Sequence, residues 1–227
     1  GYGVRKATLQ EAQSTAGLDY STRTAPELTA ALGDAAPQAP GTVRALASVE
    51  EALPGAWLGV EAVPERLDIR SPLFATVDRL ADADAVLATN SSSYASRLVI
   101  PEVSNPERVF NMHFAMPPLP MAAELMSDGV TSEAPLEGVA EELRRYGIQP
   151  FIAHKESTGF IFNRIWAAIK RESLAVVAEG VSTPDDVDAI TKANMGIPAG
   201  PFTLMDQVGL DIVLDIEDHY AAENNHL

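Results

Sequence analysis

Four polar residues in the middle of the chain have side chains that could together move a proton to and from a substrate oxygen. They are Ser92, His113, Glu124 and Asn163. A histidine exchanges protons near neutral pH, and a carboxylate beside it orients the ring and stabilises its charged form. Hydroxyl and amide groups can hold an oxygen whose charge changes during the reaction. This set of residue types therefore suits the oxidation of an alcohol or the reduction of a carbonyl.

The elements that would position these residues are predicted from four short apolar runs. Runs of this length, bounded by turn residues, are typical of buried strands. They alternate with helical patterns, which favours a mostly parallel sheet with helices on both faces. The predicted strands are 56–63, 85–89, 108–114 and 150–153, and the predicted helices are 65–80 and 132–146.

Ser92 and His113 are expected at the same edge of this sheet. Ser92 follows one predicted strand, and His113 ends the next. The carboxyl ends of parallel strands form the edge at which α/β folds bind ligands. Glu124 is the best partner for His113, because the proline-rich segment 117–120 can turn the chain back beside it.

Each of these residues also has a structural interpretation when it is taken alone. A single histidine at a strand end is more often a structural residue than a catalytic one. The serine run 91–93 could be a helix cap, and Asn163 could be exposed at the start of a helix. Glu124 alone carries no signal. The catalytic hypothesis therefore depends on the set.

In the last third of the chain the pattern becomes helical. Apolar residues from Phe160 to Leu174 recur mostly at steps of three and four, the period of an amphipathic helix. Gly180 is predicted to end that helix. Ser182-Thr183-Pro184-Asp185-Asp186 has the cap, early proline and acidic residues of a new helix start. We therefore predict an α/β domain at 1–155 and a small all-helical domain at 156–227.

Composition limits the classes of partner. The net charge of −16 over 227 residues argues against broad binding to nucleic acid or anionic membranes. No apolar run has the length of a membrane span, and no signal peptide is visible at Gly1. The chain has no cysteine, and its four histidines lack the close spacing of zinc ligands, so no metal is expected. We expect a cytoplasmic protein that binds neither nucleic acid nor membranes.

Five motifs, taken in order, resemble the L-3-hydroxyacyl-CoA dehydrogenase family. The segment from Lys155 to Phe160 resembles a bacterial and fungal branch of it. The similarity covers nearly the whole chain, and the order of the motifs is more specific than any one of them. The motifs are Glu61-Ala62-Val63-Pro64-Glu65-Arg66, Thr89-Asn90-Ser91-Ser92-Ser93, Met112-His113-Phe114, Ser157-Thr158-Gly159-Phe160-Ile161-Phe162-Asn163-Arg164 and Gly200-Pro201-Phe202.

The resemblance implies a Rossmann-like, doubly wound domain followed by a helical domain that mediates dimerisation. It implies a homodimeric enzyme that interconverts L-3-hydroxyacyl-CoA and 3-ketoacyl-CoA, a step of fatty-acid β-oxidation. His113 would be the acid/base and Glu124 its partner. Ser92 and Asn163 would contact the reacting oxygen. Glu124 lies one residue nearer His113 than in many relatives, so its role assumes a shortened loop.

The resemblance also implies NAD as cofactor. No G-x-G-x-x-G phosphate-binding motif occurs, and Gly1-Tyr2-Gly3 lacks the third glycine. The family's first strand and helix, and its last helices, are thus expected to be missing. The sequence near Lys6 lacks the expected acidic residue, which leaves NAD against NADP open at this point. The residues implied to line the cofactor are Ala62, Val63, Glu65, Asn90 and Arg70, the last replacing a lysine common in the family.

Two other functions remain open from the sequence. A dehydrogenase of a small hydroxy acid, carnitine-like or gulonate-like, would keep the same chemistry, and the acidic net charge mildly favours it. A non-catalytic dimerising protein on a dehydrogenase remnant would explain the missing phosphate loop. The non-catalytic hypothesis predicts that NADH does not bind. The hydroxyacyl-CoA and small-acid dehydrogenase hypotheses both require that NADH binds.

Overall fold

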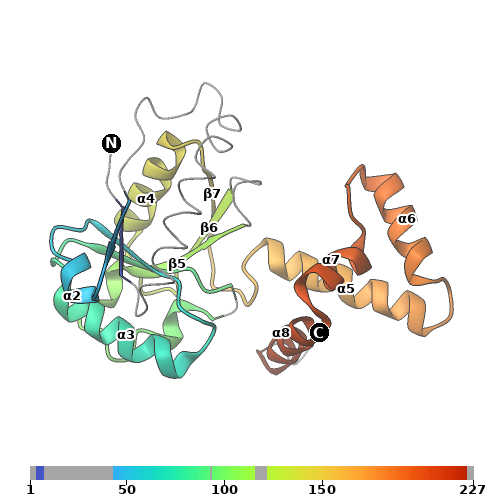
Figure 1. Ribbon diagram of the computed structural model, residues 1–227, viewed down its shortest axis with the longest axis horizontal. Helices are drawn as coiled ribbons and strands as arrows, with labels where there is room; N and C mark the ends of the chain where they lie inside the picture. The colour runs from blue at the N-terminus through green and yellow to red at the C-terminus, as the bar shows by residue number, and fades with distance from the viewer. Residues whose placement is uncertain (1–3, 8–42, 93, 116–121, 224–227) are drawn as a thin grey trace. The chain divides into compact units, whose positions relative to one another are not determined.

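The computed structural model describes residues 4–7, 43–92, 94–115 and 122–223. The glycines at 1 and 3 and the turn predicted at 117–120 lie outside the described residues. Contacts divide the chain into two compact units, Gly1–Glu156 and Ser157–Leu227. This division falls one residue beyond the boundary expected from the sequence. Each unit is described by itself below (Figure 1).

The first unit contains a five-stranded sheet in the order β3-β4-β5-β6-β7. Its strands are β3 (Leu58–Glu61), β4 (Val86–Thr89), β5 (Val109–Phe114), β6 (Ala122–Met126) and β7 (Gln149–Ala153). Only the β5–β6 pair is antiparallel, so the prediction of a mostly parallel sheet is confirmed. The sequence did not predict β6. A separate parallel pair is formed by β1 (Val4–Ala7) and β2 (Val43–Leu46), and the short helix α2 (Val49–Ala52) follows it.

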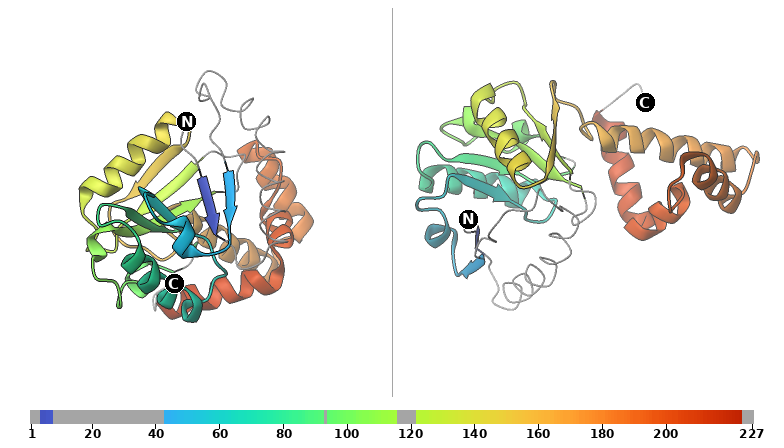
Figure 2. Two further views of the ribbon diagram at one scale, coloured as in Figure 1. Left: turned by 60° about the vertical axis from the view of Figure 1, so that its left-hand side comes forward. Right: turned by 90° about the horizontal axis from the view of Figure 1, so that it is seen from above.

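Helices cover both faces of the five-stranded sheet. Successive strand residues point to opposite faces, so Leu87 and Ala88 of β4 identify the two sides. Leu87 packs in a cluster with Phe74 of α3 (Leu67–Leu80). Ala88 packs in the cluster that contains the apolar residues of α4 (Glu133–Arg145). Figure 2 shows this layered arrangement, which confirms the predicted doubly wound, Rossmann-like class.

A buried ion pair anchors the start of β5. Arg108 Nη2 lies 2.8 Å from Asp78 Oδ1, and the backbone N–H of Ser104 donates to Asp78 Oδ2 at 2.7 Å. Burial acts to raise the pKa of Asp78, but hydrogen bonds from Arg108 and Ser104 outweigh it and hold that pKa below its ordinary value. The pair joins the end of α3 to the chain entering β5. It therefore helps to set where the strand that carries His113 begins.

The second unit is entirely helical in its described part, as predicted. Its helices are α5 (Phe162–Ala178), α6 (Pro184–Met195), α7 (Pro201–Val208) and α8 (Leu210–Glu223). Thr183 caps α6 by accepting a hydrogen bond from the backbone N–H of Asp186 at 3.2 Å. No helix in the described residues is both long enough and apolar enough to cross a membrane.

The start of α7 is held by a side chain of α6. Asp188 accepts hydrogen bonds from the backbone N–H groups of Phe202 at 2.7 Å and Thr203 at 2.9 Å. A Cβ atom at Gly200 would lie 2.5 Å from the Cα atom of Asp188, closer than real Cβ contacts allow. The Gly200-Pro201-Phe202 motif is therefore explained by helix packing in this unit.

Candidate functional site

The carboxyl ends of three strands form the edge at which the candidate site lies. Glu61 of β3 is the register partner of Thr89 of β4, and Thr89 is the partner of Asn111 of β5. Register partners in a sheet share a face, so these side chains form a polar row. Ser92 follows β4, and His113 lies two residues beyond Asn111, on the face that carries this row.

His113 and Glu124 are direct partners across the antiparallel pair β5–β6. His113 Nδ1 lies 3.7 Å from Glu124 Oε2, and the two side chains are 17% and 10% exposed. This separation is longer than a hydrogen bond and within the range of an ion pair when the imidazole is protonated. Strand pairing, which the sequence analysis missed, brings the carboxylate beside the ring. The run Ala122-Ala123-Glu124-Leu125-Met126, apolar except for Glu124, is the signal that could have revealed β6.

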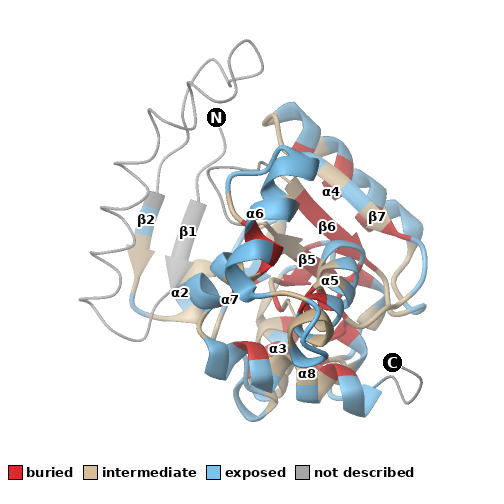
Figure 3. Cartoon of the chain, turned by 90° about the vertical axis from the view of Figure 1, so that its right-hand side faces the viewer, coloured by how far each residue is buried: buried red, intermediate tan, exposed pale blue. Residues whose placement is uncertain are grey.

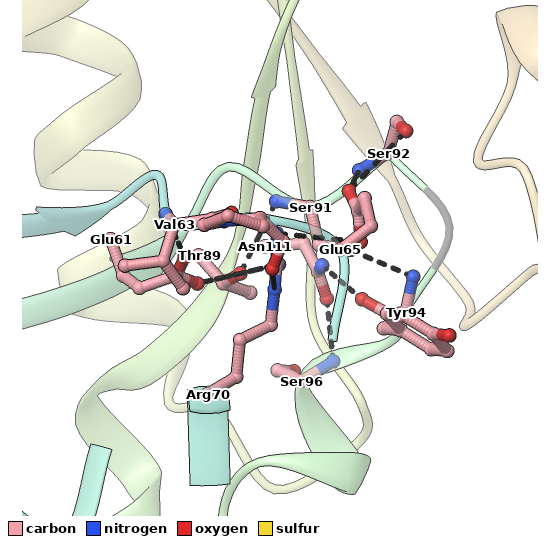
Figure 4. A network of polar contacts seen from close by, with 11 residues as sticks. Glu61, Val63, Glu65, Arg70, Thr89, Ser91, Ser92, Tyr94, Ser96 and Asn111 are labelled. Carbon is pink, nitrogen blue, oxygen red and sulfur yellow. Dashed lines mark hydrogen bonds and ion pairs between the residues drawn. The ribbon is translucent and has the colours of Figure 1, made fainter. Parts of the chain in front are cut away.

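Glu65 holds the segment that carries Ser92. The backbone N–H of Ser92 donates to Glu65 Oε1 at 2.9 Å, and the Ser91 hydroxyl donates to Glu65 Oε2 at 2.8 Å. The Ser92 hydroxyl lies 3.5 Å from Glu65 Oε1. Figure 4 shows this carboxylate between the loop after β3 and the serine segment. Ser91 and Ser92 are therefore bound to Glu65 and do not cap the short helix that follows, η2 (Ser96–Leu98), whose N-cap residue is Ala95.

Arg70 lies behind this carboxylate and is almost completely buried, at 2% exposure. Its guanidinium donates to Thr89 Oγ1 at 3.0 Å and to the carbonyl oxygen of Val63 at 2.8 Å. It also lies 3.3 Å from a carboxylate oxygen of Glu61 and 3.3 Å from one of Glu65. In this structure Arg70 binds protein groups that shape the loop after β3. Its direct contact with a cofactor stays a prediction.

The other residues implied to line the cofactor lie at the same edge. Ala62 and Glu65 are exposed, and Val63 is half-buried. The backbone N–H of Val63 donates to Glu61 Oε1, which holds the loop against the polar row. Asn90 Oδ1 accepts a hydrogen bond from the backbone N–H of Phe114 at 3.1 Å, so Asn90 ties the end of β4 to the end of β5.

Asn163 belongs to the second unit, where it is the second residue of α5 and half-buried. The fold requires glycine at position 159 of the same motif. Gly159 has φ +80°, and a Cβ atom there would lie 2.0 Å from the Tyr220 hydroxyl. Phe160 also has a positive φ, of 56°. Ser92, His113 and Glu124 thus belong to one unit and Asn163 to the other, and the catalytic role of Asn163 stays a prediction.

Two models of one protein family match the chain, each over one of its units. The model described as "3-hydroxyacyl-CoA dehydrogenase, NAD binding domain" matches residues 1–157. The model described as "3-hydroxyacyl-CoA dehydrogenase, C-terminal domain" matches residues 159–226. Together they span nearly the whole chain.

The chain is also similar to individual proteins, and two of them have names that describe different substrates. The 5-formyl-3-hydroxy-2-methylpyridine 4-carboxylate 5-dehydrogenase of Mesorhizobium japonicum is 31% identical over 228 residues, 98% of this chain and 72% of that protein. The 3-hydroxybutyryl-CoA dehydrogenase of Clostridioides difficile is 33% identical over 158 residues, 69% of this chain but only 56% of that protein. The crystal structure of FadB2 from M. tuberculosis aligns with a TM-score of 0.87 at 29% identity, over 100% of this chain and 81% of that one.

Proposed function

Because the chain belongs to the 3-hydroxyacyl-CoA dehydrogenase family, we propose that it interconverts L-3-hydroxyacyl-CoA and 3-ketoacyl-CoA with His113 and Glu124 as its acid/base pair. The cofactor is NAD, since residues 1–157 match the NAD-binding domain of the family. One observation carries the assignment of the pair: Glu124 lies opposite His113 across β5 and β6, with 3.7 Å between Nδ1 and Oε2.

The geometry of the pair assigns a role to each atom. Nδ1 of His113 faces the carboxylate of Glu124, which leaves Nε2 to accept the proton of the substrate hydroxyl. NAD, when bound, takes the hydride from the carbon that carries that hydroxyl. The carboxylate stabilises the imidazolium that forms, and reduction runs the same proton transfer in reverse. Catalytic contacts are often long in ligand-free proteins, so we expect the 3.7 Å separation to shorten when substrate binds.

The described residues fit the nicotinamide end of the cofactor. The loop after β3 presents the exposed Ala62 and the half-buried Val63 at the strand edge, which can contact the flat ring. Glu65 and Asn90 add polar groups beside them that can hydrogen-bond a ribose. Arg70 donates hydrogen bonds to the carbonyl oxygens of Pro64 and Val63 in this loop.

The test is to replace His113 and Glu124 one at a time by glutamine and to follow acetoacetyl-CoA reduction through NADH absorbance. We expect each change to lower kcat by about 10²- to 10⁴-fold, the usual contribution of a positioned acid/base. NADH binding, followed by its fluorescence, should persist in both variants. His154→Gln is the matched control, because His154 is exposed and lies beyond β7. Unchanged turnover in His113→Gln would contradict the proposed pair.

A second substrate class has a specific observation behind it. The Mesorhizobium relative, whose name describes a pyridine carboxylate substrate, is similar over 98% of this chain. A small carboxylic acid that carries a hydroxyl or carbonyl group is therefore the alternative substrate, and it includes the carnitine-like and gulonate-like acids. Comparing kcat/KM for acetoacetyl-CoA and for free acids separates the two. Failure of NADH to bind the wild-type protein would instead favour a non-catalytic remnant.

We also propose that the second unit forms a homodimer interface. Figure 3 colours much of its helical backbone as exposed, and several of its exposed residues are large and apolar. Exposed apolar surface of this kind is typical of protein interfaces. These side chains include Phe162, Ile165, Ile190, Leu210 and Leu214. Light scattering after size exclusion should give twice the chain mass, and a monomeric mass would contradict the interface. The cytoplasmic location stays a prediction.

A further inference from the structure

Asn111 links two parts of the candidate site through one side chain. It is fully buried, and both ends of its amide are bound: Oδ1 accepts from the backbone N–H of Ser96 at 2.7 Å, and Nδ2 donates to the carbonyl oxygen of Tyr94 at 2.8 Å. Tyr94 and Ser96 belong to the segment after β4 that carries Ser92. Asn111 itself lies in β5, two residues before His113.

We infer that Asn111 is a positioning residue that fixes Tyr94 and Ser96, in the segment that carries Ser92, relative to His113. This inference rests on the proposed function, because it concerns the geometry of that active site. Both hydrogen bonds of Asn111 go to backbone groups, so they locate the main chain of the segment rather than one of its side chains. A buried amide with both ends bound has one orientation, and turning it would leave a buried donor and acceptor unmatched.

The opposite end of the segment is held by other residues. The backbone N–H of Ser91 donates to Thr89 Oγ1 at 3.2 Å, and that of Ser92 donates to Glu65 at 2.9 Å. Figure 4 shows these contacts at one end of the segment and those of Asn111 at the other. Removing the Asn111 amide takes away both backbone anchors at the far end, where the Ser96 hydroxyl still donates to Asp128 Oδ2 at 2.9 Å, and leaves the contacts of Ser91 and Ser92 in place. The Asn111 contacts tie residues 94 and 96 to β5, the strand that carries His113.

Displacement of Ser92 from His113 would affect the chemical step more than cofactor binding. Misplacing a reacting group by about 1 Å can cost on the order of 10²-fold in rate. The cofactor-lining loop after β3 is held separately, by Arg70 and Glu61. Loss of the Asn111 amide should thus lower kcat, with little effect on the Kd for NADH.

Two variants test the inference. Asn111→Leu keeps a similar volume and removes both hydrogen bonds. Asn111→Asp is the isosteric change: it keeps an acceptor for the Ser96 N–H, and the neutral carboxyl group that burial favours can still donate its proton toward the carbonyl oxygen of Tyr94. The control is Val109→Ala on the same strand, because Val109 is equally buried and its side chain packs in the apolar cluster with Leu87. The measurements are hydrogen exchange of the Ser96 amide by NMR, kcat and KM for acetoacetyl-CoA, and Kd for NADH.

In Asn111→Leu we expect the Ser96 amide to exchange about tenfold faster or more and kcat to fall by about 10- to 100-fold. Asn111→Asp should keep the protection of Ser96 and lose less activity. Val109→Ala should keep the wild-type kcat. Unchanged Ser96 exchange and kcat in Asn111→Leu, or an equal loss of kcat in Val109→Ala, would overturn the inference. If the wild-type protein does not reduce acetoacetyl-CoA, the proposed function fails, and Ser96 exchange still decides whether Asn111 holds the segment.

Discussion

Replacing Arg70 by methionine tests whether one buried cation holds the loop at the sheet edge. Methionine keeps much of the apolar volume and removes the charge and all the hydrogen-bond donors. Arg70 donates to Thr89 Oγ1 and to the carbonyl oxygens of Val63 and Pro64. It also lies 3.3 Å from Glu61, whose side chain is 5% exposed. The substitution therefore leaves a buried carboxylate without its counter-charge.

The size of the effect follows from what remains around Glu61. Breaking a buried ion pair by removing one partner costs about 3–5 kcal/mol. Glu61 keeps hydrogen bonds from the backbone N–H of Val63 and from the Thr89 hydroxyl, which favours the lower end of this range. About 3 kcal/mol corresponds to a decrease in Tm of about 6–12 °C for a chain of this size.

The assay can separate the two units, because each contains one tryptophan, Trp57 in the first and Trp166 in the second. In a Trp166→Phe background, thermal unfolding followed by fluorescence reports on the first unit. Arg66→Met is the matched control, since Arg66 lies at the start of the same helix and its ion pair with Asp68 is more than half exposed. We expect little change in that control. Equal Tm values for the two variants would refute a structural role for the buried network.

Two further predictions concern the junction of α6 and α7. Gly200→Ala should destabilise the second unit by about 1–3 kcal/mol, because the new methyl group would lie 2.5 Å from Asp188. By contrast, a methyl group at Gly138 in α4 meets no atom within 4 Å, so Gly138→Ala should stabilise the first unit by about 0.5–1 kcal/mol. Denaturant unfolding followed by Trp166 fluorescence measures the stability of the second unit, and Trp57 fluorescence that of the first. An unchanged free energy of unfolding in Gly200→Ala would contradict the close packing. Burial acts to raise the pKa of Asp188, but hydrogen bonds from Thr203 and Phe202 hold it below its ordinary value. Its contribution to stability should therefore be present above about pH 4 and be lost as pH falls through the lowered pKa. Asp188→Asn should be less stable at pH 7 and lose less stability in acid, so equal pH dependence in the two proteins would show that the carboxylate is not the anchor.

Local sequence patterns determined most of the helices and strands of this protein. The apolar runs predicted as strands became β3, β4, β5 and β7, with ends that shifted by a few residues. Thr183 and Pro184 begin α6 as predicted, because capping depends on residues within one turn of each other. The position of Ser92 and His113 after neighbouring strands also followed from the sequence, since parallel strands end at one edge.

The sequence paired Glu124 with His113, but the tertiary structure alone decided the strand register that brings them together and the hydrogen bonds of Arg70 and Asn111. Glu124 meets His113 through the register of β5 and β6, and the sequence of β6, apolar except for Glu124, does not alternate polar and apolar positions. The helical pattern of residues 65–80 does not show that Arg70 is buried, whereas in the structure it lies 3.3 Å from Glu61 and from Glu65 and donates to Thr89, 19 positions away. Asn111 contacts residues 15 and 17 positions away. Periodicity in a sequence reports which face of an element is apolar, whereas ion pairs and buried hydrogen bonds depend on strand register and burial, which arise only when distant segments pack together.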